Sequence, residues 1–116
     1  MDDIVKTIRY NTLLAIYSEL LSARQKEILC DYYEYNLSIS EIAENKNVSR
    51  AAVEDAIKKG TSKLEYFEEK LGVYAMKHDI NELIIKFKEN NENTNVDDLL
   101  EQIKKVIEYG IWIINW

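Results

Sequence analysis

Four residues between positions 49 and 59 have side chains that can contact a nucleic acid. A guanidinium can donate paired hydrogen bonds to guanine or to a phosphate, ammonium groups suit phosphates, and a serine hydroxyl can donate to a phosphate. These types occur as Ser49, Arg50, Lys58 and Lys59. The sequence therefore predicts a nucleic-acid-binding surface with these four residues as its contacts.

Acidic residues in the same stretch leave a second interpretation open. Glu54 and Asp55 lie between the basic residues, and their carboxylates repel phosphates, although a carboxylate can accept a hydrogen bond from cytosine. The whole chain of 116 residues has a formal net charge of −6, which opposes DNA binding because affinity for DNA comes largely from basic residues. The alternative is therefore a solvated helix face of mixed charge.

Catalytic and metal-binding chemistry has little support in the sequence. His78 is the only histidine and Cys30 the only cysteine, so we predict no metal site, no internal disulfide and no cofactor. No Ser/His/Asp order and no glycine-rich phosphate loop is present. We therefore predict that the protein is not an enzyme, and that Cys30 is a small side chain near the core.

The lone cysteine fits a reducing compartment. The acidic beginning of the chain is unlike a signal peptide, and no apolar run approaches the length of a membrane helix. We therefore expect a cytoplasmic protein without a membrane span.

The basic residues lie within a predicted helix-turn-helix at about 38–59. Such a motif needs a small residue where its helices cross, a residue that accepts positive φ in the turn, an apolar plug, a helix cap and a buried residue in the second helix. These roles fall, in that order, to Ala43, Asn47, Val48, Ser49 and Val53. Two ordinary core helices joined by a short turn are the alternative. One position fits less well, because Ala56 is small and Ile57 supplies the bulk.

The rest of the chain also has helical spacing of its apolar residues, and no stretch alternates as a strand would. Helices are expected at 4–21, 22–36, 38–46, 50–71 and 79–89, with a last helix capped by Thr94 or Asn95. Capping boxes begin two of them, Ser22 with Gln25 and Ser38 with Glu41. Gly60 weakens the continuity of the helix at 50–71. We predict one all-α domain, 1–116, with a helical extension at 79–116.

The end of the sequence, YGIWIINW (109–116), is strongly apolar. A monomer of this size would struggle to bury two tryptophans and their isoleucine neighbours. We therefore expect the last helix to form a homodimer interface or to dock on a partner.

The sequence from Leu20 to Leu71 resembles the YlxM-like proteins, a family of small bacterial helix-turn-helix proteins. The resemblance rests on the segments RQKEIL, LSISEIAE and NVSRAAV, and on YFEEKLGVY, which lies outside a generic helix-turn-helix. It implies an all-helical bundle similar to the fourth region of sigma factors, often dimeric. It also implies a regulatory role connected with the signal recognition particle pathway. The sequence departs from the family at Ala51, Glu54 and Ala56, which replace residues typical of its recognition helix.

Two functional hypotheses follow. In the first, the protein is a helix-turn-helix regulator that binds duplex DNA or particle RNA. In the second, its helix-turn-helix does not bind DNA and docks on a protein or RNA of the targeting machinery.

Overall fold

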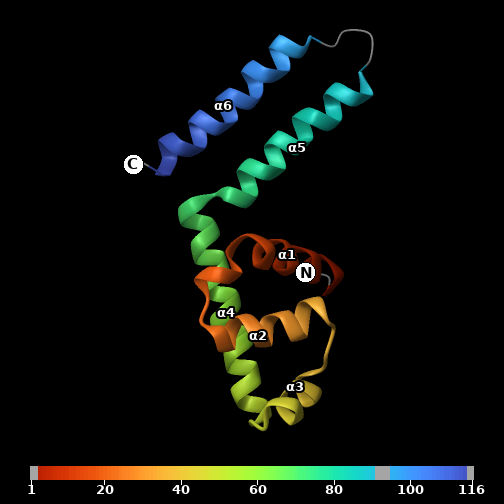
Figure 1. Cartoon of the computed structure of the whole chain (residues 1–116), viewed down its shortest axis with the longest axis vertical. Helices are drawn as coiled ribbons and strands as arrows, with labels where there is room; N and C mark the ends of the chain where they lie inside the picture. The colour runs from red at the N-terminus through yellow and green to blue at the C-terminus, as the bar shows by residue number, and fades with distance from the viewer. Residues whose placement is uncertain (1–2, 91–94, 115–116) are drawn as a thin grey trace. The chain divides into compact units, whose positions relative to one another are not determined.

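The computed structural model describes residues 3–90 and 95–114, with the side chains of 3–90 and 95–108. Contacts divide the chain into two compact units, Met1–Glu69 and Lys70–Trp116. In order along the chain, the elements are α1 (Asp3–Tyr17), η1 (Ser18–Leu20), α2 (Ala23–Leu29), η2 (Cys30–Glu34), α3 (Ile39–Lys46), α4 (Arg50–Leu71), α5 (Val73–Glu89) and α6 (Val96–Ile114) (Figure 1). The described residues contain no strand, so the predicted all-α class is confirmed. The expectation of a single domain stays a prediction.

Both predicted capping boxes are present. The Ser22 hydroxyl accepts from the Gln25 backbone N–H at 3.2 Å, and the Gln25 side chain accepts from the Ser22 N–H at 3.4 Å. The same reciprocal pair joins Ser38 and Glu41 at 3.0 and 3.1 Å. Because each pair satisfies two backbone donors that the first helical turn leaves unpaired, α2 and α3 begin where the sequence predicts.

The helix expected at 22–36 changes its geometry at Cys30, where the π-helical turn η2 follows α2. The Tyr35 N–H donates to the Cys30 carbonyl five residues back at 3.0 Å. The Asn11 side-chain amide of α1 donates to the Tyr33 carbonyl at 2.9 Å, which ties η2 to the first helix. Asn36, at φ 56°, ends this segment as predicted.

The core of the first unit combines residues from α1, α2, α3 and α4. Leu13, Ile28, Leu29, Val53 and Leu64 are fully buried. Polar contacts add to this packing at its edge. The Arg9 guanidinium of α1 donates two hydrogen bonds to the Glu65 carboxylate of α4, and the Tyr17 hydroxyl donates to Glu68 at 2.7 Å.

Gly60 does not interrupt α4, which is continuous from Arg50 to Leu71. A Cβ at Gly60 would lie 2.5 Å from Cδ1 of Leu29. The glycine therefore allows α2 and α4 to approach closely, and the packing of Leu29 against it offsets its low helix propensity.

In the second unit, α5 and α6 pack against each other. Helix α5 begins at Val73, six residues before the predicted start at Asp79. Gly72, predicted as a stop, adopts φ 63° and its carbonyl accepts from the Met76 N–H at 3.0 Å, so a new helix follows directly. Asn95 caps α6, since its side chain accepts from the Asp97 N–H at 3.0 Å. Thr94, the other predicted cap, lies outside the described residues.

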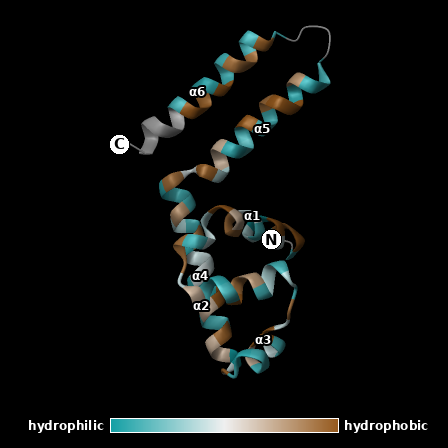
Figure 2. Ribbon diagram, viewed as in Figure 1, coloured by the Kyte–Doolittle hydropathy of each residue, from teal (hydrophilic) through white to brown (hydrophobic). Residues whose placement is uncertain are grey.

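Apolar residues recur along both helices of this unit (Figure 2). None of its described side chains is fully buried, and Ile80, Leu83, Phe87, Leu99 and Ile103 are half-buried. The side chains of 109–116, on which the expectation of a dimer interface rested, lie outside the described residues. Among the described helices, none is long and apolar enough to cross a membrane.

Candidate nucleic-acid interface

The turn between α3 and α4 has the geometry that the sequence predicts. Asn47 adopts the left-handed conformation with φ 55° and ψ 48°. The Val48 N–H donates to the Ala43 carbonyl at 3.0 Å, which closes the end of α3. The Ser49 hydroxyl then accepts from the Ala52 N–H at 3.0 Å and caps α4. Local hydrogen bonds therefore fix the direction in which α4 leaves the turn.

The two helices of the motif pack on α2 through small and branched side chains. Ile28, Ile42, Ala43 and Val53 form one buried cluster. Ala43 is 6% exposed and fills the role of the small residue at the crossing. Around this cluster pack partly buried residues, among which are Val48, Ala56 and Ile57. The less regular position in the motif is thus filled by Ala56 and Ile57 together.

This packing leaves one face of α4 exposed. All four predicted contact residues, Ser49, Arg50, Lys58 and Lys59, are exposed, and so are the acidic Glu54 and Asp55. The hydroxyl of Ser49 accepts one hydrogen bond as the helix cap and can still donate to another group. The structure therefore brings the predicted residues to one element and mixes them with both acids.

The cations near this face differ in their ion pairs. The Lys59 ammonium lies 3.0 Å from the Asp55 carboxylate, and both side chains are largely exposed, so this pair is weak. Lys46 has a structural role instead, because its side chain is 17% exposed and its ammonium lies 2.6 Å from Glu27 and 3.6 Å from Asp31. Within the described part of the chain, Arg50 and Lys58 have no ion-pair partner.

A pocket of about 480 Å³ lies beside the predicted contacts. It is lined by Gln25, Asp55, Lys58, Lys59, Ser62 and Lys63. The Lys63 ammonium donates to the Gln25 side-chain oxygen at 3.2 Å, across 38 residues of sequence. Sequence reasoning missed Lys63 and Gln25, because only the crossing of α2 and α4 brings them together. The one signal was the spacing of Lys63, four residues after Lys59.

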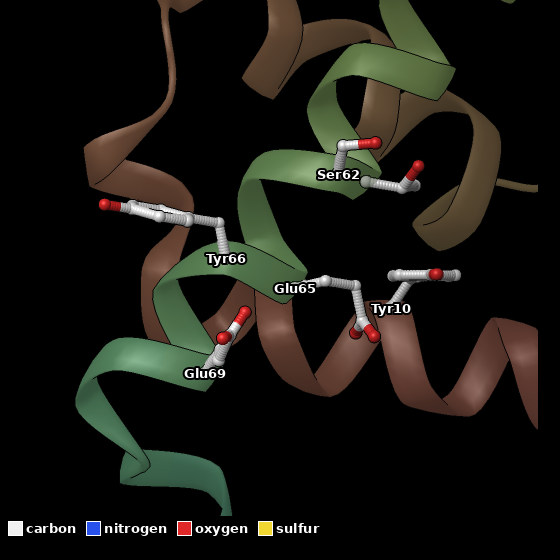
Figure 3. Close-up of a pocket in the computed structure, with 6 residues that line it drawn as sticks. Tyr10, Ser62, Glu65, Tyr66 and Glu69 are labelled. Atoms are coloured by element: carbon white, nitrogen blue, oxygen red, sulfur yellow. The ribbon is translucent and has the colours of Figure 1, made fainter.

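A second pocket of the first unit, about 290 Å³, lies between α1 and α4 (Figure 3). Its lining includes Tyr10, Glu65, Tyr66 and Glu69. The Arg9 guanidinium already pairs with Glu65 at 2.8 Å. Burial, and then the Glu65 charge, raise the pKa of the Tyr10 phenol, so this phenol stays neutral.

The remaining candidate residues have structural surroundings. Cys30 is half-buried, and burial together with Glu34 raises the pKa of its thiol, which disfavours the reactive thiolate. His78 is exposed and its ring stacks on Tyr74, with centroids 6.4 Å apart. Among the described side chains, no three His, Cys, Asp or Glu residues are grouped to hold a metal ion.

Comparison with known proteins identifies relatives over most of the chain. The family model described as "Putative helix-turn-helix protein, YlxM / p13 like", UPF0122, matches residues 4–106. The UPF0122 protein FN1394 of Fusobacterium nucleatum is 46% identical over 91 residues, which cover 78% of this chain and 88% of the relative. The UPF0122 protein MYPE4850 of Malacoplasma penetrans is 43% identical, covering 77% and 80%. The UPF0122 protein lmo1802 of Listeria monocytogenes is 39% identical over 106 residues, covering 87% and 96%.

Proposed function

Because the chain belongs to the UPF0122 family of YlxM/p13-like helix-turn-helix proteins, we propose that it is a regulator that binds nucleic acid through α4. The contacts are Ser49, Arg50, Lys58 and Lys59. The role is not enzymatic, and the protein acts in the cytoplasm.

The observation that supports this proposal most is that the turn between α3 and α4 is well ordered by hydrogen bonds and that the beginning of α4 is exposed. Asn47 and Ser49 hold the start of α4 by local hydrogen bonds. Arg50 lies exposed directly after the cap. A second helix presented in this way enters the major groove of duplex DNA, with its first residues nearest the base edges.

Each contact residue has a distinct role in this proposal. The Arg50 guanidinium donates to guanine or to a phosphate, as its fork of donors allows. Lys58 and Lys59 neutralise phosphates farther along the helix. Ser49 donates its hydroxyl proton to a phosphate next to the helix start. Because these cations replace counterions on the phosphates, we expect binding that weakens steeply with salt. Glu54 and Asp55 lie between these groups and lower the affinity.

We also propose that the regulator is a homodimer formed through its last helix. Val96 and Leu100 are each 58% exposed on α6, and Ile107 is 39% exposed. At 100° per residue these three positions fall within about 40° of one another on the helix, so they form one apolar stripe. A second copy of α6 would cover that stripe and bring two helix-turn-helix motifs together.

A second candidate function is docking on the signal recognition particle machinery, through its RNA or a protein. The acidic residues favour a protein as the docking partner, because the net charge is −6 and Glu54 and Asp55 lie exposed on α4. Ala51 also removes a hydrogen-bonding side chain from that face.

Two substitutions of opposite sign test duplex binding. Arg50→Ala should weaken binding to a labelled DNA duplex, and Glu54→Gln should strengthen it, because each changes one charge on the same exposed face. Fluorescence anisotropy over a series of salt concentrations measures both. Failure of the wild-type protein to bind any duplex at low salt, combined with capture of particle RNA or a targeting GTPase, would favour the second function.

A further inference from the structure

We infer that the pocket between α2 and α4 binds a backbone phosphate of duplex DNA. This inference rests on the proposed function and extends it to Lys63, a residue outside the predicted contacts. In this inference the start of α4, around Arg50, contacts the base edges, and the pocket farther along α4 binds the phosphate.

Charge is the first argument. The lining contains the ammonium groups of Lys58, Lys59 and Lys63 and a single carboxylate, that of Asp55. Three positive charges and one negative charge leave +2 in the pocket, whereas the chain as a whole carries −6. Lys59 already balances Asp55 at 3.0 Å. The pocket thus concentrates positive charge on an acidic protein and favours an anion.

The groups that line the pocket indicate which anion fits. Lysine ammonium groups are compact charges that suit phosphate oxygens, and the Ser62 hydroxyl can donate a further hydrogen bond. The lining contains no arginine fork to read a base edge and no aromatic ring on which a base could stack. This composition fits a phosphate of the backbone better than a nucleobase.

Position along α4 provides the third argument. At 1.5 Å per residue, Lys58 lies about 12 Å and Lys63 about 20 Å beyond Arg50 along the helix axis. The major groove is about 12 Å wide. With the start of α4 in the groove, residues this far along have left the groove and stand at its phosphate-lined edge. The distance along the axis therefore allows one duplex to reach both Arg50 and the pocket, whose lysines Lys58 and Lys63 lie about 80° and 140° around the helix from Arg50.

One of these lysines is held in place before any ligand binds. The Lys63 ammonium donates to the side chain of Gln25, which the capping box of α2 fixes in turn. An ammonium that is already positioned loses less side-chain entropy when it binds a phosphate. Lys63 is therefore the anchoring residue that we single out.

The test measures the salt dependence of binding to a random-sequence DNA duplex for the wild type, Lys58→Gln, Lys63→Gln and the double variant. The deciding variant is Lys63→Gln, because Lys58 already contacts a phosphate in the proposed function. Loss of the phosphate contact at Lys63 should reduce the slope of log K against log salt by about 0.9 in Lys63→Gln. Between about 50 and 200 mM salt, that variant should lose about 3.5-fold less affinity than the wild type. Lys104→Gln is the matched control, because it removes one exposed lysine of an i,i+4 ion pair outside the pocket.

Each outcome separates the inference from the function on which it rests. If the wild type binds and both Arg50→Ala and Lys58→Gln weaken binding, but Lys63→Gln keeps the wild-type slope, the pocket does not hold a phosphate. A slope reduced equally by Lys104→Gln also overturns the inference, because the effect would then be one of overall charge. Equal lysine dependence on an RNA duplex would overturn the assignment to DNA. If the wild type binds no duplex at low salt, the proposed function itself fails.

Discussion

Gly60 lies where α2 crosses α4, and replacing it with alanine sets two effects against each other. Alanine favours the helix, but its Cβ would lie 2.5 Å from Cδ1 and 3.1 Å from Cγ of Leu29. Leu29 is fully buried, so its side chain cannot turn aside without disturbing its neighbours. The contact at Leu29 decides the sign of the effect.

The expected magnitude follows from these two opposing effects. Exchanging glycine for alanine in a helix interior stabilises by about 0.8–1.0 kcal/mol. Forcing an extra methyl into a packed core costs about 1–3 kcal/mol. We therefore expect Gly60→Ala to lower the free energy of unfolding by about 1 kcal/mol, the difference between these ranges. For a unit of this size, the Tm should fall by roughly 4–8 °C.

Thermal unfolding followed by circular dichroism measures this change, and a double-mutant cycle assigns its cause. Leu29→Ala alone should cost about 2–5 kcal/mol. Combined with Gly60→Ala it should cost less than the sum, because the new methyl group fills part of the space left by Leu29. Gly72→Ala is the control, since a Cβ there meets no atom within 4 Å and the strain comes only from φ 63°.

The reasoning would be refuted by a clear result. If Gly60→Ala raises the Tm by the full amount of the helix propensity, and the two substitutions are additive, the close approach of Leu29 to Gly60 is absent. The pocket that α2 and α4 form together would then lose its structural basis.

Three further predictions concern the residues that shape the first unit. Asn47→Ala should destabilise by about 1 kcal/mol, because the left-handed turn disfavours a Cβ, whereas Asn47→Gly should retain the wild-type Tm; thermal unfolding of both tests this. Lys46→Met should destabilise by about 1 kcal/mol, more than Lys104→Met, whose ion pair is exposed; a smaller effect in chemical denaturation would contradict the structural role of Lys46. Burial raises the pKa of Tyr33 from 10.0 to about 12. The neutral phenol therefore contributes stability below pH 10 that is lost as the pH rises towards 12. Tyr33→Phe should remove that share of the alkaline destabilisation, which unfolding at a series of pH values measures.

Much of the fold could be predicted from the sequence, because its signals are local. A capping box joins groups three residues apart, as Ser22 with Gln25 and Ser38 with Glu41. The left-handed turn at Asn47 depends on one residue that tolerates positive φ. The prediction was wrong at the start of α5, because one local signal, the glycine at position 72, is compatible with two outcomes. Gly72 ends one helix by its conformation, but that conformation also lets the next helix begin at Val73.

By itself, then, the sequence determined the helices, the turn and the exposed polar face of α4, since these depend on neighbours along the chain. Only the tertiary structure decided how lysines of similar sequence context divide their roles. The Lys46 ammonium forms ion pairs with Glu27 and Asp31, whereas the Lys63 ammonium donates a hydrogen bond to Gln25 at the pocket. The tertiary structure also decided that Gly60 is the surface of α4 on which Leu29 packs. The physical reason is that these contacts join α2 or η2 to α3 or α4. The spacing of residues within one helix does not show which side chains of another helix will pack against it.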